Sequence, residues 1–283
     1  MLTSDGALFV VATPLGNADD LSPRAREVLE SAELVLAEDT RRAGLMCQRC
    51  NVRAKRFLSF HDHNEEEKTA SIVTMLKEGA RLALVSDAGL PLVADPGYRL
   101  VRACRAEGIP VSVIPGPCAP VTALAGSGIA PQPFTFFGFL PRARADIEET
   151  LRPFAALPVT LIFFERKDRL AETLRTAAAV LGPRELCIAR ELTKTHEEYL
   201  VGRLETPPDT AGLLGEITVV VGPPEARAVT PREEILALIA EERRGGGSPR
   251  AIARRVQARA LGWTVKGIYA MMSSETGTEP AEE

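Results

Sequence analysis

The sequence predicts an α/β fold with two domains, followed by a small helical unit. Short apolar runs alternate with longer amphipathic segments as far as Val221, as strands and helices alternate in α/β proteins. Three of these runs end in turns rich in glycine and proline, and the length of 283 residues exceeds what one hydrophobic core usually supports. We therefore expect α/β domains at 1–118 and 119–226, a helical unit at 227–275 and a flexible acidic tail at 276–283.

The first domain is expected to begin with an apolar strand, Leu8–Ala12. Ser22 is a good helix cap and Pro23 suits the first helical position, so a helix is expected over 22–32. Later apolar runs continue the alternation of strand and helix at 34–37, 82–85, 100–106 and 111–114.

The second domain is expected to begin near residue 118, where the pattern of residues along the sequence changes. An aromatic stretch, Phe134–Phe139, follows two closely spaced prolines, and the helix at 169–181 ends at Gly182-Pro183. Apolar runs predict strands at 159–164, 186–189 and 217–221.

The third unit is expected to contain helices and no strands. Helices are predicted at Pro231–Arg244, from Ser248 to the Leu261-Gly262 pair, and from Thr264 to Met272. The glycine turn at 245–247 gives the order helix, tight turn, helix, which is typical of a helix-turn-helix unit.

Composition excludes several classes of protein. With 45% hydrophobic and 25% charged residues, the chain is neither wholly disordered nor fibrous. The first apolar run is too short for a signal peptide or a membrane span, and five scattered cysteines do not form a secreted disulfide framework. We expect a cytoplasmic protein with reduced thiols.

The charge is unevenly distributed along the chain. The net charge is −4, yet the segment from Arg243 to Gly267 holds seven positive side chains and no acidic one. Within it, Arg250 with Arg254 and Arg255 with Arg259 have the spacing of one helical turn. This basic face suits RNA phosphates, and a solvated surface is an equally good interpretation.

Three strands of the first domain are expected to end in turns suited to a ligand. The turns are Thr13–Asn17, Ser86–Pro91 and Pro115–Pro117. In an open parallel sheet, loops at the carboxyl ends of the strands meet at one crevice. Each turn alone is more typical of an ordinary connection, but three at one edge favour a cofactor site.

The same turns indicate which cofactor to expect. No dinucleotide fingerprint or phosphate loop follows the first strand, which argues against a dinucleotide or a nucleoside triphosphate. Exposed backbone groups and the carboxylate of Asp87 offer mixed donors and acceptors. Such a set fits S-adenosylmethionine, which carries amino, carboxylate and adenosine groups.

Ionisable residues gather in three other segments. Glu38–Arg42 follows a strand and suggests a proton acceptor, although a helix cap with a salt bridge explains it equally well. His61 and His63 would face the same side of an extended segment, and Arg190–His196 follows a strand of the second domain. Cys47-Gln48-Arg49-Cys50 has no matching second pair, so we expect no metal site.

These motifs together identify a family. The chain resembles the ribosomal RNA small subunit methyltransferase I family, which has the tetrapyrrole methylase fold, from about Leu8 to Gly222. The motifs that carry the resemblance are the turns at 13–17, 37–41, 61–64, 84–89, 95–97, 115–118, 138–141 and 189–194.

The resemblance implies a homodimer that uses S-adenosylmethionine to methylate the 2′-hydroxyl of a decoding-centre cytidine in 16S rRNA, without a metal. The cofactor would lie against Leu15, Asp87, Gly89, Pro91, Pro115, Gly116, Cys118, Phe164 and Leu192. The candidate catalytic residues are Asp39, His61 and Glu191, with His63 as a further candidate base. RNA would contact Arg41, His63, Asn64 and Lys194, and the terminal unit would contribute Arg250 and Arg254.

Three segments depart from the family pattern. Leu90 replaces a usual threonine, the stretch after Pro141 is short, and Glu165–Asp168 replaces a usual Glu-Ser-x-His. Two other functions stay open at this point: a C-methyltransferase acting on a tetrapyrrole, and a non-catalytic nucleic-acid-binding regulator.

Overall fold

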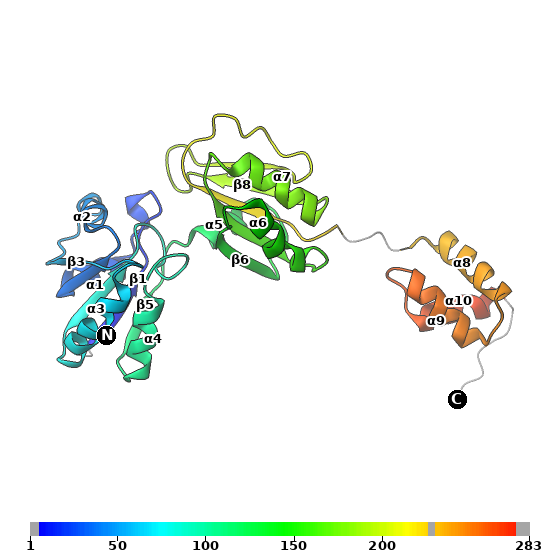
Figure 1. Ribbon diagram of the computed structural model, residues 1–283, viewed down its shortest axis with the longest axis horizontal. Coiled ribbons are helices and arrows are strands. Elements are labelled where there is room, and N and C mark those ends of the chain that lie inside the picture. The colour runs from blue at the N-terminus through cyan, green and yellow to red at the C-terminus, as the bar shows by residue number, and fades with distance from the viewer. Residues whose placement is uncertain (1–5, 226–229, 276–283) are drawn as a thin grey trace. The chain divides into compact units, whose positions relative to one another are not determined.

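The computed structural model describes residues 6–225 and 230–275. It divides into two compact units, with the division between Pro224 and Glu225. The first unit contains two sheets with helices around them, and the second contains helices (Figure 1). The predicted α/β class is confirmed. The predicted acidic tail at 276–283 lies outside the described residues.

The first sheet has five parallel strands in the order β3-β2-β4-β1-β5. These strands are β1 (Ala7–Val11), β2 (Leu34–Ala37), β3 (Phe57–Ser59), β4 (Arg81–Val85) and β5 (Val111–Ile114). The associated helices are η1 (Ala18–Asp20), α1 (Pro23–Ser31), α2 (Thr40–Arg49), α3 (Glu65–Lys77) and α4 (Tyr98–Ala106).

Both faces of this sheet are covered, which explains why its strands read as continuous apolar runs. Phe9 and Val11 point into a core shared with α1 and α2, whereas Leu8 and Val10 point into a second core shared with α3 and α4. All five residues of β1 are buried. The carboxyl ends of the strands are therefore left as the edge where loops can meet a ligand.

Local hydrogen bonds set where several helices begin. The Ser22 side chain accepts a hydrogen bond from the Ala25 backbone N–H at 3.1 Å, so the predicted cap is present. Buried Glu65 accepts from the backbone N–H groups of Gly97 and Arg99 at 3.2 and 3.0 Å. This carboxylate therefore ties the start of α3 to the start of α4.

The second sheet is mixed, in the order β6-β7-β10-β8-β9, with only the β6–β7 pair parallel. Its strands are β6 (Phe134–Phe139), β7 (Thr160–Glu165), β8 (Glu185–Arg190), β9 (Glu198–Arg203) and β10 (Ile217–Val221). The accompanying helices are α5 (Ala119–Ser127), α6 (Arg144–Leu151), η2 (Arg152–Phe154) and α7 (Leu170–Leu181).

Helix α5 packs on one face of the second sheet, and α6 and α7 cover the other. Arg184 is fully buried beneath this second face. Its guanidinium donates to the backbone carbonyls of Phe154, Ala155 and Gly222 at 2.9, 2.8 and 3.0 Å. These bonds satisfy a charge that would otherwise be costly to bury.

The second unit consists of α8 (Arg232–Arg244), α9 (Pro249–Arg259) and α10 (Val265–Glu275) around a small core that includes Ile235, Val256 and Ile268. The turn between α9 and α10 contains Gly262 at φ +75°. No helix among the described residues is long and apolar enough to cross a membrane.

The segment around the two neighbouring histidines differs from the expectation. His61–Asn64 is a turn that leads into α3, not an extended segment. The turn forms because Asn64 Oδ1 accepts from the His61 backbone N–H at 2.9 Å and the Asn64 backbone N–H donates to the His61 carbonyl at 2.9 Å. The two rings still lie close together, with centroids 5.9 Å apart.

Candidate active site

The three predicted turns meet at the carboxyl edge of the first sheet. The turns after β1 and β4 pair directly, because Thr13 and Gly89 exchange backbone hydrogen bonds at 2.8 and 3.1 Å. Gly89 has φ +81°, a conformation that glycine adopts without strain. At Gly116 an added Cβ would lie 2.9 Å from the Ala12 Cβ, so this glycine allows the turn after β5 to approach β1.

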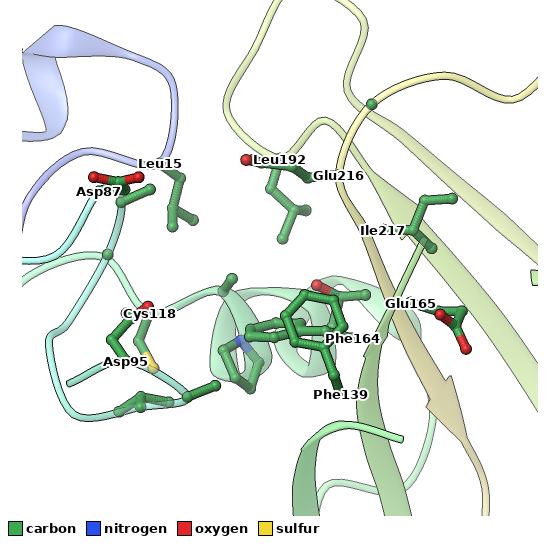
Figure 2. A pocket seen from close by; sticks show the side chains of 18 of the residues that line it. Leu15, Asp87, Asp95, Cys118, Phe139, Phe164, Glu165, Leu192, Glu216 and Ile217 are labelled. Carbon is green, nitrogen blue, oxygen red and sulfur yellow. The ribbon is translucent and has the colours of Figure 1, made fainter. Parts of the chain in front are cut away.

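A cavity of about 770 Å³ lies beside these turns. Its wall combines residues that follow strands of the first sheet with the ends of β6, β7 and β10 and the loop after β8. Figure 2 shows Leu15 and Leu192 pointing toward the same space, with the Phe139 and Phe164 rings next to each other. The centroids of these two rings are 5.4 Å apart. A cavity of this volume, lined by apolar side chains together with charged ones, suits a small organic ligand that carries both apolar and charged groups.

Some of the predicted cofactor residues line this cavity, and the others do not. The residues that line it are Leu15, Asp87, Gly89, Cys118, Phe164 and Leu192. Pro91, Pro115 and Gly116 belong to the same turns but do not line it.

The loop that carries Leu192 has an uncommon backbone conformation. Glu191 and Thr193, on either side of Leu192, have φ values of +49° and +65°, and neither is a glycine. The Thr193 hydroxyl accepts from the Asn17 backbone N–H at 3.1 Å, which joins this loop to the turn after β1. Such strain persists only where surrounding contacts fix the backbone, and it is concentrated at functional sites.

Carboxylates gather on one side of the cavity. Asp95 is half-buried, and burial followed by the negative charge of Glu38 raises its pKa to about 6, although a hydrogen bond from Ser86 opposes this. Partial desolvation, followed by the charges of Asp87 and Asp62, also raises the pKa of Glu38. Asp87 is compensated by Arg42, whose Nη1 lies 2.5 Å from its Oδ2.

The three predicted catalytic residues do not line the cavity. Asp39 caps α2 and binds Arg41 through Oδ1 and Oδ2, and these hydrogen bonds lower its pKa to about 2. Burial raises the pKa of Glu191, but hydrogen bonds from Lys194 and the Glu216 backbone outweigh it and lower the pKa overall. His61 Nδ1 is buried and has no hydrogen-bond partner in the described part of the chain.

The predicted RNA contacts are spread over several surfaces. Arg41 and His63 are exposed. The Asn64 side chain accepts a hydrogen bond from the His61 backbone N–H within its own turn. Lys194 bridges Glu191 and Glu216 at 2.9 and 3.0 Å and lines a second hollow of about 350 Å³ next to the main cavity. An added Cβ at Gly16 would lie 2.2 Å from Lys194 Cγ, so the glycine provides room for this lysine.

In the second unit the basic face is narrower than the sequence predicts. Arg255 binds Glu242 at 2.6 Å, and Arg259 binds Glu241 and Glu242 at 3.0 and 3.1 Å. These ion pairs join α9 to α8, so the two arginines are engaged within the protein. Arg250 and Arg254 are exposed and form no ion pair among the described residues.

Sequence reasoning missed several residues of the cavity wall. These are Glu38, Arg42, Asp95, Phe139 and Glu216. Four of them lie within motifs or stretches noted from the sequence, and for Glu38 and Phe139 the position at a strand end was a usable signal. Glu216 had no such signal, because only the pairing of β10 beside β8 brings it to Lys194.

The comparisons with known proteins agree with this geometry. Residues 7–208 match the model of the Tetrapyrrole (Corrin/Porphyrin) Methylases. "Ribosomal RNA small subunit methyltransferase I" of Haemophilus influenzae is 40% identical over 280 residues, covering 93% of this chain and 95% of the relative. The chain belongs to the ribosomal RNA small subunit methyltransferase I family of tetrapyrrole methylases.

Other members and neighbours of this family extend the comparison. The protein of the same name from Escherichia coli O157:H7 is 48% identical over 195 residues, covering 69% of this chain and 68% of that protein. Among solved structures, the methyltransferase CobJ has a TM-score of 0.60 at 22% identity, covering 80% of this chain and 96% of CobJ. A uroporphyrin-III C-methyltransferase from Thermus thermophilus, complexed with S-adenyl homocysteine, has a TM-score of 0.54 at 19% identity, covering 76% of this chain and 96% of that one. At these identities the two structures show the fold alone.

Proposed function

We propose that this family member methylates the 2′-hydroxyl of a decoding-centre cytidine in small-subunit ribosomal RNA, using S-adenosylmethionine. The observation that carries the proposal is the cavity at the carboxyl edge of the first sheet, closed by Phe164 and Leu192 of the second domain. Curated relatives that are 40% and 48% identical are named for a ribosomal RNA substrate. They are much closer to this chain than the tetrapyrrole enzymes of the same fold.

The wall of the cavity fits the chemistry of S-adenosylmethionine. Leu15, Phe164 and Leu192 provide apolar surface for an adenosine group. The carboxylates of Asp87 and Asp95 suit the positive charges of an amino group and a sulfonium. Backbone groups of the turn at 87–90 supply further donors and acceptors. When bound, S-adenosylmethionine supplies the methyl group that is transferred.

The residues of the chain have to align the acceptor and remove its proton. In the transfer, the ribose 2′-oxygen forms a bond to the methyl carbon as the carbon–sulfur bond breaks, the sulfur keeps the electron pair, and the hydroxyl proton leaves. Among the carboxylates, Asp39 and Glu191 are poor acceptors because cations hold both pKa values low. We therefore propose Glu38, whose pKa is raised, as the proton acceptor, with His61 as the second candidate.

Binding of the RNA is proposed to involve both units. Arg250 and Arg254 are exposed cations without an ion pair among the described residues, and they suit phosphate groups. We also propose that the protein works in the cytosol as a homodimer, as the family resemblance implies. Sedimentation equilibrium tests the homodimer: a particle of two chains supports it, and a monomer that retains full activity overturns it.

The experiment that tests the function is transfer of labelled methyl groups to small ribosomal subunits from cells that lack the native modification. Label on the ribose of one cytidine, mapped by nuclease digestion and mass spectrometry, is the expected result. Label on a base, or label only on a tetrapyrrole offered in parallel, overturns the proposal. Failure to bind S-adenosylmethionine at all would favour a non-catalytic nucleic-acid binder.

A further inference from the structure

The second hollow next to the main cavity has no role in binding the cofactor as proposed above. Its volume is about 350 Å³, and it shares a wall with the main cavity. The residues of that shared wall are Leu15, Arg42, Asp87, Ala88 and Glu216. The hollow therefore adjoins the main cavity along these residues.

One face of α2 forms the outer side of this hollow. Arg42, Leu45, Met46 and Arg49 line it, and their spacing of three and four residues places them on the same face of the helix. Leu45 is 55% exposed, which is unusual for a leucine beside a cavity. The face thus offers two apolar side chains, Leu45 and Met46, with Arg42 before them and Arg49 after them.

The positive charge of this face continues past the end of the helix. From Thr40 to Arg56 the sequence contains six lysines and arginines and no acidic residue. Arg49, Arg53 and Arg56 are exposed, and none of them forms an ion pair within the described ranges. The other cations of the hollow differ, because Arg42 is paired with Asp87 and Lys194 with Glu191 and Glu216. Arg49 is therefore the cation at the hollow whose charge is uncompensated.

The loop after α2 is fixed in place along α1. Arg26 donates to the backbone carbonyl of Asn51 at 2.8 Å, and Lys55 Nζ donates to the carbonyl of Ser31 at 3.2 Å. Arg26 lies in the first half of α1 and Ser31 is its last residue, so the loop between the two contacts runs beside that helix. Arg53 lies between the two fixed points, and Arg56 follows the second. Arg49 therefore lies at the rim of the hollow, and Arg53 and Arg56 follow it along this tethered loop.

We propose that the hollow holds the acceptor nucleoside, with its base against Leu45 and Met46, and that Arg49, Arg53 and Arg56 bind successive phosphates of the RNA strand that enters it. This inference rests on the proposed function, because it assigns the RNA substrate to a defined surface. Phosphate contacts position a strand and make binding depend on salt, whereas the apolar contact places the nucleoside. The RNA would then reach the site over α2 of the first domain.

The test replaces Arg49, Arg53 and Arg56 by glutamine, together and singly, in the full chain. The matched control is Arg102→Gln, an exposed arginine on α4 at the opposite face of the same sheet. RNA affinity and methylation are measured over a salt series, with S-adenosylmethionine affinity measured in parallel. We expect the triple variant to bind RNA at least tenfold more weakly, with a salt slope shallower by about 2 to 3. Its S-adenosylmethionine affinity and the behaviour of Arg102→Gln should match the parent protein.

The outcomes separate this inference from the proposed function. If the parent protein methylates RNA and the triple variant keeps its RNA affinity and salt slope, the α2 surface is not the RNA track. If the parent protein methylates no RNA, the proposed function fails before the variants are compared. Arg49→Glu is the second variant, since reversal of one exposed charge tests the rim of the hollow even if the triple variant unfolds. An unchanged KM for RNA in Arg49→Glu also overturns the inference.

Discussion

Glu38 and Asp39 are neighbours in sequence but differ in chemistry. Asp39 turns toward Arg41 and the start of α2, where hydrogen bonds stabilise its ionised form. Glu38 lines the cavity, where partial burial, followed by the negative charges of Asp87 and Asp62, favours its protonated form. Arg42 and His61 oppose this effect but do not outweigh it. At the end of β2, Glu38 is thus a candidate proton acceptor, whereas the next residue, Asp39, is a helix cap.

The first prediction concerns this pair. Glu38→Gln should lower kcat by about 10²- to 10⁴-fold, because it removes the proposed proton acceptor. Asp39→Asn should change kcat only slightly, since asparagine also caps helices well. Single-turnover methylation at several pH values provides the measurement, and the low-pH limb of the parent profile should disappear in Glu38→Gln. A wild-type rate in Glu38→Gln would transfer the role to His61.

The second prediction concerns Asp95 and stability. Its pKa in the folded protein is about 6, above the ordinary value of 3.8, so ionisation is less favourable in the folded chain than in the unfolded chain. The destabilisation is absent below the ordinary pKa, grows as the pH rises toward 6 and is constant above it. Asp95→Asn should therefore raise the melting temperature by a few degrees at pH 8.

Thermal unfolding without cofactor, at pH 4 and pH 8, provides the measurement for Asp95→Asn. The gain should be much smaller at pH 4, where Asp95 is protonated in the folded chain and partly protonated in the unfolded chain. An equal gain at both pH values would mean that the effect does not come from ionisation. The charged groups that face Asp95 are Glu38, Asp87 and Asp62, so these should be kept unchanged in the comparison.

At the scale of elements, the site depends on how turns leave the strands of the first sheet. The turn after β4 has to reverse at Gly89 and pair with Thr13, which requires a positive φ. The turn after β5 has to approach β1 without a side chain at Gly116. Strand ends and glycines together therefore place Leu15 and Asp87 on one wall.

The third prediction compares two glycines with positive φ. Gly89→Ala and Gly79→Ala should each lower the free energy of unfolding by about 1 kcal/mol, because alanine is strained in this conformation. Gly89 lines the cavity, whereas Gly79 precedes β4 at the opposite edge of the sheet. Only Gly89→Ala should weaken S-adenosylmethionine binding, measured by calorimetry. Equal affinities in both variants would show that the turn does not shape the site.

At the scale of the whole molecule, two units share the proposed work. Residues up to Pro224 contain the main cavity, the second hollow and the α2 surface. The second unit has its own core, and its α8 and α9 are joined by the Glu242 ion pairs. Cofactor binding and part of the RNA binding should therefore be separable.

The fourth prediction follows from this division. A chain that ends at Pro224 should bind S-adenosylmethionine within about twofold of the full protein, since the cavity is complete without the second unit. Its RNA affinity should fall about tenfold or more, and Arg250→Gln with Arg254→Gln in the full chain should reproduce part of the loss with a shallower salt slope. Filter binding at several salt concentrations measures both. Unchanged RNA affinity would exclude the second unit from RNA binding.

The sequence by itself determined the α/β class, the positions of most strands and the family. Apolar runs such as 34–37 and 82–85 fall on β2 and β4, because strands buried on both faces have a continuous apolar pattern. Glycine and proline turns at strand ends also indicated the edge of the sheet where Leu15, Asp87 and Gly89 line the cavity. Apolar runs and turn residues are local features, so they can be recognised directly in the sequence.

Only the tertiary structure decided which side chains line the same cavity and which charged residues form ion pairs with each other. The apolar, cationic face of α2 became visible once the helix lay beside the hollow. Pairing of Arg255 and Arg259 with Glu241 and Glu242 reduced the basic face of α9 to Arg250 and Arg254. Burial and then nearby carboxylates raised the pKa of Glu38, and hydrogen bonds from Arg41 lowered that of Asp39. Electrostatic interactions depend on distance through space, and the order of residues along the chain does not contain that distance.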